Sequence, residues 1–367
     1  MSTINESDYW LGFSVFPGIG PKKFILLIEE FKTAKEAWEA SEGKLVTILG
    51  PALTRKFVTY REKINLIDYA KRLEKASVWY LLSSDVQYPQ LLKQIDDPPF
   101  VLYGRGDKKV LTTEHIIGIV GTRKITSYGR HVTEMITREL VGAGYCVVSG
   151  LAMGVDAIAH ATTINEGGKT IAVLGCGADC CSPRENTLLY NRIISEGSCV
   201  VSEFPLSQSP TPGSFPSRNR IIAGLSQAVV VTEGAVDSGA LITASDALKN
   251  NRPVFAIPGP ITSSLSKGPN KLLREGARLV AGGEDIIREL GGMGISRHKG
   301  KMSGKVIKGE SVEEQAIINV LMDEELSFDE LIVLIKSSPA ILNMQLSMME
   351  MKGIIQKTQN GNFQLCA

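Results

Sequence analysis

The feature that most constrains the fold is a series of six short apolar runs separated by helical patterns, all between about residues 111 and 290. Each run is apolar without interruption, which is typical of strands buried on both faces of a parallel sheet. The alternation therefore predicts an α/β domain in which helices cover both faces of a parallel sheet. The predicted strands are His115–Gly121, Tyr145–Gly150, Thr170–Gly175, Ser198–Glu203, Gln227–Glu233 and Arg252–Gly259.

Small and polar residues follow these predicted strands, in the segments GTRK, SGLAMG, GCGADCCSPREN, SEFP, TEGAVDSGA and PGP. In an open α/β sheet, ligands bind outside the carboxyl ends of the strands, where short loops bring backbone amides together. We therefore expect a ligand site at this edge, although the same segments also suit simple tight turns.

A basic stretch, Ser214–Ser226, reads SFPSRNRIIAGLS and precedes the fifth predicted strand. It places Arg218 and Arg220 beside Phe215 and Asn219, and it predicts a basic loop followed by a helix that starts at RIIAGLS. Arginines at the start of a helix can meet an anion held by free backbone N–H groups. A capped helix with solvated arginines is an equally good interpretation of this stretch alone.

The amino-terminal flank, residues 1 to about 75, has helical periodicity. The segment FPGIGPKK places a Gly18–Gly20 turn before Pro21 and looks like a helix-hairpin-helix element, whose turn amides can contact a DNA phosphate. We favour a tight turn between two packed helices, because the motif is short. Residues 76–110 predict a strand, a short helix and another strand that extend the central domain to 76–290.

The carboxyl-terminal flank begins with a Gly-, Lys- and Ser-rich stretch, 291–310, that predicts a flexible basic linker. Residues 311–367 then predict three helices and a hairpin with its turn at Asn360-Gly361, which together suggest a small winged-helix domain. Its third predicted helix lies within Ser338–Gly353, where Lys352 is the single lysine. We therefore favour a partner or dimer contact over duplex DNA for this domain.

The bulk composition limits the partners. The 367-residue chain is long enough for two or three domains, and its net charge of +1 means that any anion site must be local. No apolar run approaches a membrane span, and MSTINESDYW lacks the build of a signal peptide, so we expect a cytoplasmic protein without membrane contact. Cys176, Cys180 and Cys181 lie close together but lack paired C-x-x-C or histidine partners, which argues against a zinc site.

Familiar catalytic and cofactor motifs fail on inspection. The GGKT segment at Gly167–Thr170 lacks the earlier glycine of a P-loop and precedes a predicted strand instead of a helix. The first predicted strand is followed by GTRKITSYG, not G-x-G-x-x-G, so an ordinary dinucleotide site is not expected. Asp156 and His160 lie one helical turn apart, a spacing that a simple contact on a helix face also explains. We predict no cofactor, no metal and no catalytic residues.

The motifs in their order resemble the bacterial DNA-processing protein A family, also called DprA or Smf. The matching segments are YPQLLKQIDDPPFVLYGRG, GIVGTRKITSYGR, SGLAMGVDAIAH, TIAVLGCGAD, SEFP, FPSRNRIIAGLS, SGALITA and GPNKLLREGA. The resemblance implies a Rossmann-like central domain between an amino-terminal helical domain of the sterile-alpha-motif or helix-hairpin-helix kind and a winged-helix tail. It also implies a homodimer that binds single-stranded DNA, protects incoming DNA and loads the RecA recombinase on it during natural transformation.

The family pocket is basic and lies at the carboxyl edge of the sheet. Two positions depart from the family pattern: Ser182 stands where tyrosine is usual, which weakens the assignment of Arg184, and Asp237 stands where a basic residue is common. The predicted nucleic-acid interface comprises Gly121, Thr122, Arg123, Ser149, Gly150, Arg184, Phe215, Arg218, Asn219, Arg220, Ser238 and Gly239. In it, arginine forks grip phosphates, amides of the 121–122 turn add donors, and the phenyl ring stacks on a base.

Two alternatives remain. The central domain also resembles lysine-decarboxylase-like phosphoribohydrolases, which use a catalytic glutamate, and Glu233 is present at the comparable loop although the glycine run is not. This alternative is a nucleotide-processing enzyme. The other alternative is a pure adaptor whose pocket has no function, against which the retained Arg123, Arg218 and Arg220 argue.

Overall fold

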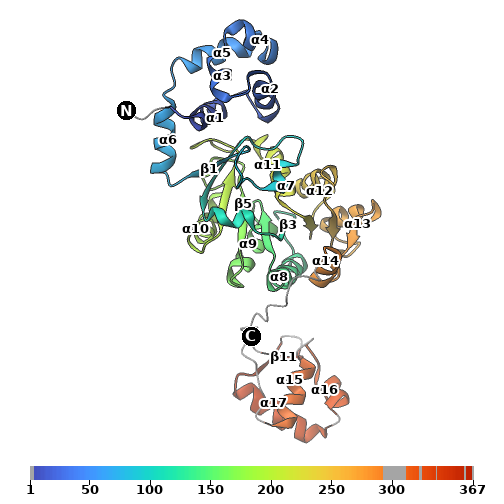
Figure 1. Cartoon of the computed structure of the whole chain (residues 1–367). Coiled ribbons are helices and arrows are strands. Elements are labelled where there is room, and N and C mark those ends of the chain that lie inside the picture. The colour runs from blue at the N-terminus through green and yellow to red at the C-terminus, as the bar shows by residue number, and fades with distance from the viewer. Residues whose placement is uncertain (1–3, 292–310, 322–324, 336, 359–360, 366–367) are drawn as a thin grey trace. The chain divides into compact units, whose positions relative to one another are not determined.

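The computed structural model describes residues 4–291, 311–321, 325–335, 337–358 and 361–365. The chain forms two compact units, residues 1–298 and 299–367 (Figure 1). Apart from its first residue, the predicted linker at 291–310 lies outside the described residues. The domain boundaries expected from the sequence stay predictions.

The first unit is built on a nine-stranded sheet with the order β1-β2-β6-β5-β4-β3-β7-β8-β9. All pairs from β6 to β9 are parallel, whereas β2 pairs antiparallel with both β1 and β6. This confirms the predicted α/β architecture. The strands are β1 (Trp79–Leu82), β2 (Val101–Gly106), β3 (Ile116–Val120), β4 (Cys146–Ser149), β5 (Thr170–Val173), β6 (Cys199–Ser202), β7 (Ala228–Val231), β8 (Val254–Ala256) and β9 (Arg278–Leu279).

Helices cover both faces of the sheet because the strands bury apolar side chains on both sides. One face packs against α7 (Gln90–Lys93), α11 (Ser214–Leu225), α12 (Gly239–Lys249) and α13 (Lys267–Arg274). The other face packs against α8 (Ser127–Gly142), α9 (Val155–Asn165), α10 (Thr187–Ser195) and α14 (Gly283–Glu289). Strand β3 shows the alternation, since Ile116 and Val120 join one core and Ile117 and Ile119 the other. Short 3-10 helices are η1 (Lys108–Thr112), η2 (Arg184–Asn186) and η3 (Ser264–Ser266).

Six amino-terminal helices share an apolar core with β1 and β2. Phe24 of α2 stacks on Phe100, which immediately precedes β2, with ring centroids 4.1 Å apart. The Gly18–Gly20 turn joins α1 to α2, and the φ of Gly18 is +106°, a value that favours glycine. The helices are α1 (Glu6–Val15), α2 (Pro21–Phe31), α3 (Ala34–Glu39), α4 (Glu42–Leu49), α5 (Pro51–Arg61) and α6 (Leu66–Lys75).

The second unit contains α15 (Val312–Leu321), α16 (Phe328–Ile335), α17 (Pro339–Met351) and an antiparallel pair, β10 (Ile355–Lys357) with β11 (Phe363–Leu365). The three helices and two strands occur in the predicted order. Asn360 of the predicted turn lies outside the described residues, and the winged-helix assignment stays a prediction.

Among the residues that the structure describes, no single helix is both long and apolar enough to cross a membrane. One bent pair in this part of the chain, α16 with α17, meets the requirements of length and composition when the two helices are taken together.

Candidate functional site

The candidate site lies at the carboxyl edge of the sheet, the edge at which β3 to β8 end. A pocket of about 120 Å³ opens there between the loops that follow three parallel strands and the first turns of α11. Its lining combines two arginines with apolar and small residues. The lining residues are Arg123, Gly150, Ala152, Met153, Ser182, Pro183, Phe215 and Arg218.

Helix α11 delivers Phe215 and Arg218 to this pocket. The helix begins at Ser214, whose hydroxyl donates to the carbonyl oxygen of Gly175 after β5 at 2.6 Å. The predicted helix start at Arg220 was therefore wrong, because Ser214–Asn219, expected as a loop, already belong to the helix. Pro216 falls in the first helical turn, where a residue without an N–H group costs the helix no hydrogen bond.

Arg218 is the central group of the pocket. Its side chain lies against the backbone of Gly150, since a Cβ atom added to that glycine would lie 1.3 Å from Nη1 of the arginine. Arg218 is only 4% exposed, and its Nε is buried without a hydrogen-bond partner. Among the described residues, none forms a hydrogen bond or ion pair with its guanidinium group. A buried cation without a partner is costly, so this arrangement is poised to accept an anion.

Arg123 and Phe215 form the outer part of the pocket. The Arg123 guanidinium carbon lies 5.4 Å from the centroid of the Phe215 ring, within the range of a cation–π contact. Arg123 itself is exposed, in the loop after β3. The pocket thus combines a buried cation, Arg218, with an exposed cation, Arg123, and an aromatic ring that contacts the exposed one.

Asp156, on the first turn of α9, shapes the loop beneath Arg218. Its carboxylate accepts hydrogen bonds from the N–H groups of Gly150 at 3.1 Å and Ala152 at 3.3 Å. Burial raises the pKa of Asp156, and the positive charge of Arg218 opposes that rise. Burial lowers the pKa of Arg218, an effect that Asp156 opposes and Arg123 reinforces. From the sequence, this aspartate was interpreted as a contact on a helix face. Its position in the first helical turn after a Gly-rich loop could have indicated that it binds the amides of that loop.

His160, one turn further along α9, is fully buried. Thr170 Oγ1 donates to the carbonyl oxygen of Val147 at 2.6 Å, so His160 Nδ1 donates to Thr170 Oγ1 at 2.7 Å. Its Nε2 is buried without a hydrogen-bond partner among the described residues. Burial, with a smaller effect from Arg218, lowers the pKa of His160 to about 3. The imidazole is therefore neutral and structural at physiological pH.

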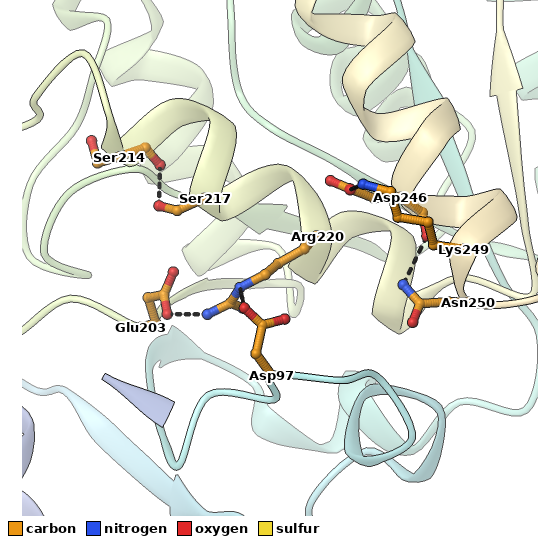
Figure 2. A network of polar contacts seen from close by, with 8 residues as sticks. All are labelled: Asp97, Glu203, Ser214, Ser217, Arg220, Asp246, Lys249 and Asn250. Carbon is orange, nitrogen blue, oxygen red and sulfur yellow. Dashed lines mark hydrogen bonds and ion pairs between the residues drawn. The ribbon is translucent and has the colours of Figure 1, made fainter. Parts of the chain in front are cut away.

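Arg220 does not join Arg218. Figure 2 shows its guanidinium group between two carboxylates, where Nε lies 3.1 Å from Asp97 Oδ2 and Nη2 is hydrogen-bonded to Glu203 Oε2. The side chains of Arg220 and Glu203 are each 13% exposed. Burial raises the pKa of Glu203, and Arg220 opposes that rise. The predicted grouping of both arginines around one anion is corrected: in the structure, Arg220 neutralises two acids.

Several other predicted residues are engaged within the protein. The Thr122 N–H donates to the Glu233 carbonyl oxygen at 2.7 Å, so it does not serve as the free amide we expected. Gly121 packs against Val155, since an added Cβ atom would lie 2.5 Å from Val155 Cγ2. The Ser149 hydroxyl donates to the Ile119 carbonyl oxygen at 2.6 Å.

The remaining predicted residues also lie outside the pocket lining. Asn219 Nδ2 donates to the Gly239 carbonyl oxygen at 3.2 Å, which ties α11 to the start of α12. Ser238 is the N-cap of α12, where its hydroxyl accepts from the Ala240 N–H at 3.3 Å. Arg184 is exposed in η2, directly after the pocket residue Pro183.

Glu233, the residue on which the enzyme alternative depends, caps a helix. Its two carboxylate oxygens accept hydrogen bonds from the N–H of Thr126 at 3.0 Å and from the hydroxyl of Thr126 at 2.6 Å. Thr126 is the N-cap of α8, and Glu233 is only 2% exposed. Among the described residues, no group of three or more histidine, cysteine, aspartate or glutamate side chains has an arrangement that could hold a metal ion.

A mostly parallel α/β sheet covered on both faces, with a pocket formed by loops at its carboxyl edge, defines a Rossmann-like protein. The sequence model of the DNA recombination-mediator protein A family matches residues 79–291, a range that contains every strand of this sheet. The chain belongs to that family, as the motif resemblance indicated.

Individual relatives agree. The chain is 38% identical over 292 residues to Protein Smf of Synechocystis, which covers 78% of this chain and 73% of the relative. It is 41% identical over 241 residues to DNA processing protein DprA of Bacillus subtilis, with 65% of this chain and 76% of the relative covered.

The structure of DNA processing protein A from Streptococcus pneumoniae superposes with a TM-score of 0.67 at 34% identity, covering 79% of this chain and 99% of that one. A structure of the Helicobacter pylori protein, which addresses its single-stranded DNA binding mode, gives a TM-score of 0.53 at 32% identity and covers 59% and 97%.

Proposed function

We propose that this protein binds single-stranded DNA without catalysis, with Arg218 and Arg123 holding backbone phosphate and Phe215 stacking on a base. The proposal rests on Arg218, a residue that is 4% exposed, lines the pocket and forms no hydrogen bond or ion pair among the described residues. A phosphate supplies the two-pronged acceptor that an arginine fork matches. The related Helicobacter pylori protein, described for its single-stranded DNA binding, supports the choice of ligand.

We extend the proposal to the cellular role. As a homodimer in the cytoplasm, the protein protects incoming single strands and loads the RecA recombinase on them during natural transformation. Relatives named DNA processing protein DprA support the DNA-processing part of this role. Loading is tested by RecA filament formation on a strand precovered with single-strand-binding protein. Sedimentation velocity tests the dimer against the 39.7 kDa mass of one chain.

The binding test is fluorescence anisotropy of a labelled poly-dT strand over a salt series. Removing one phosphate-binding side chain should reduce the slope of log K against log salt by about 0.7 for a single strand. Arg218→Ala and Arg123→Ala should each lower both the affinity and the slope. Arg138→Ala is the matched control, because this exposed arginine pairs with Glu134 and Glu166 far along α8 from the pocket. Unchanged binding by both pocket variants would refute the proposed site.

The enzyme alternative is weakened by the position of the Glu233 carboxylate, which is occupied by Thr126. Incubation with nucleoside monophosphates, with release of free base as the readout, tests it directly. Release by the wild type that disappears in Glu233→Gln, while the variant still melts like the wild type, would restore the enzyme interpretation.

A further inference from the structure

Five large apolar side chains are exposed on the loops and helix starts at the carboxyl edge of the sheet. Each follows a different parallel strand, namely β3, β4, β5, β7 or β8. Their exposed fractions are 40% for Tyr128, 47% for Met153, 80% for Leu188, 53% for Val236 and 89% for Ile261. We call this set the apolar rim.

The rim is an extended strip, because parallel strands end at the same edge and neighbouring strands lie about 4.8 Å apart. From β5 to β8 there are four such spacings, or about 19 Å. Met153 lines the arginine pocket, so the rim includes part of the proposed phosphate site. The Tyr128 hydroxyl donates a hydrogen bond to the carbonyl oxygen of Pro258 at 2.6 Å.

Exposed apolar side chains gathered on one edge mark an interaction surface. The occupant must also suit the cations of that edge, Arg123, Arg184 and Arg218. A single strand meets both requirements, because its phosphates are anionic and its unpaired bases present flat faces of low polarity. Single residues contributed by successive loops also suit a ligand with repeating units.

We propose that the apolar rim contacts the bases of a single strand whose phosphates are held by the arginine pocket. This inference rests on the proposed function and adds the part of the ligand that the rim recognises. Base contacts of this kind add affinity that is independent of salt and tolerant of sequence, because every base has a π-face. The pocket then governs the salt dependence, and the rim governs the affinity that persists at high salt.

The test compares labelled poly-dT with an abasic strand of the same length, each over a salt series. Tyr128→Ala should weaken poly-dT binding about tenfold, which is a loss of about 1.4 kcal/mol and lies within the range of one stacked base. The salt slope should stay unchanged, and binding of the abasic strand should not change. Tyr128→Phe, which keeps the ring and removes the hydrogen bond to Pro258, should bind like the wild type.

Leu188→Ala and Ile261→Ala provide a second test of base contact by the rim. Both side chains are exposed, so their removal leaves the core intact. The double variant should weaken poly-dT binding and spare the abasic strand. Equal losses on both strands would mean that the variants disturb the pocket, and unchanged poly-dT binding would mean that the rim does not contact bases. Normal DNA binding combined with failed RecA loading would assign the rim to a protein partner. Failure of the wild type to bind either strand would refute the proposed function itself.

Discussion

Replacement of Arg220 by alanine should destabilise the protein, because this arginine neutralises two acids. Its guanidinium group bonds Glu203 and lies 3.1 Å from Asp97, and the side chains of Arg220 and Glu203 are 13% exposed. Removing one partner from a buried ion pair costs about 3–5 kcal/mol, since a charge stays buried without compensation. Asp97 is 36% exposed and therefore partly screened, so we expect the low end, about 3 kcal/mol.

Urea unfolding at pH 7, followed by circular dichroism on the whole chain, measures this loss as a lower transition midpoint. Glu203→Gln in the Arg220→Ala background should recover part of the stability, because the unpaired charge is removed. The deficit of Arg220→Ala should also shrink as the pH falls. Glu203 has a pKa that burial raises and Arg220 opposes, so without the arginine this carboxyl takes up a proton more readily and its buried charge disappears.

Arg218→Ala is the matched comparison on the same helix. Arg218 has no bonded acid among the described residues, and Asp156 retains two backbone N–H donors without it. We expect its unfolding free energy to change by no more than about 1 kcal/mol, because the decrease in packing is offset by removal of a buried charge. Wild-type stability in Arg220→Ala together with failed DNA binding would refute the assignment, because it would make Arg220 a ligand contact.

Three further predictions concern Gly150, His160 and the second unit. Gly150→Ala should abolish single-strand binding in anisotropy with little loss of far-UV signal, because the added methyl group would overlap the Arg218 guanidinium. The contribution of His160 should lower the unfolding free energy of the wild type by about 2 kcal/mol between pH 7 and pH 5. The reason is that the unfolded imidazole, with a pKa of about 6.5, binds a proton in this range, whereas the folded imidazole, with a pKa of about 3, does not. The His160→Gln variant should lack this pH-dependent loss, and a variant with the same pH profile as the wild type would contradict the prediction. Ser327→Ala should lower the stability of the second unit by about 1 kcal/mol in calorimetry, because it removes the reciprocal cap in which Ser327 Oγ accepts from the Glu330 N–H and Glu330 accepts from the Ser327 N–H.

The parallel sheet could be predicted because its signal is local. Each strand is an uninterrupted apolar run. The predicted strand Gln227–Glu233, for example, exceeds β7 (Ala228–Val231) by one residue at its start and two at its end. What the sequence did not reveal is pairing across the sheet. The antiparallel contact between β2 and β6 joins residues about a hundred positions apart, and no periodicity encodes it. Helix α10 and the two-residue strand β9 were also missed. The helix directly follows the cysteine-rich segment GCGADCCSPREN, and the strand is too short to show a pattern.

Part of the site could also be predicted, because its residues follow from the local positions of strand ends and a helix start. Arg123, Gly150, Phe215 and Arg218 meet in the pocket because each follows a strand end or begins the helix that crosses those ends. The expected amide of Thr122 could not be assessed from sequence, since its acceptor is a carbonyl oxygen on another strand's loop.

The separate roles of Arg218 and Arg220 follow from one fact, the residue at which α11 begins. Successive residues on an α-helix are about 100° apart, so two residues separated by two positions point to nearly opposite sides. Once the helix starts at Ser214, both arginines lie on it and cannot reach the same anion. Arg218 then faces the sheet, where Gly150 provides the space for its guanidinium group. Arg220 faces the acids of two neighbouring loops. Arg220 ties the helix to those loops through its two acids, whereas Arg218 is buried without a bonded acid among the described residues. A chain with a net charge of +1 can thus keep a cationic pocket, because Arg218, which faces that pocket, forms no hydrogen bond or ion pair with an acid in the part of the chain that the structure describes.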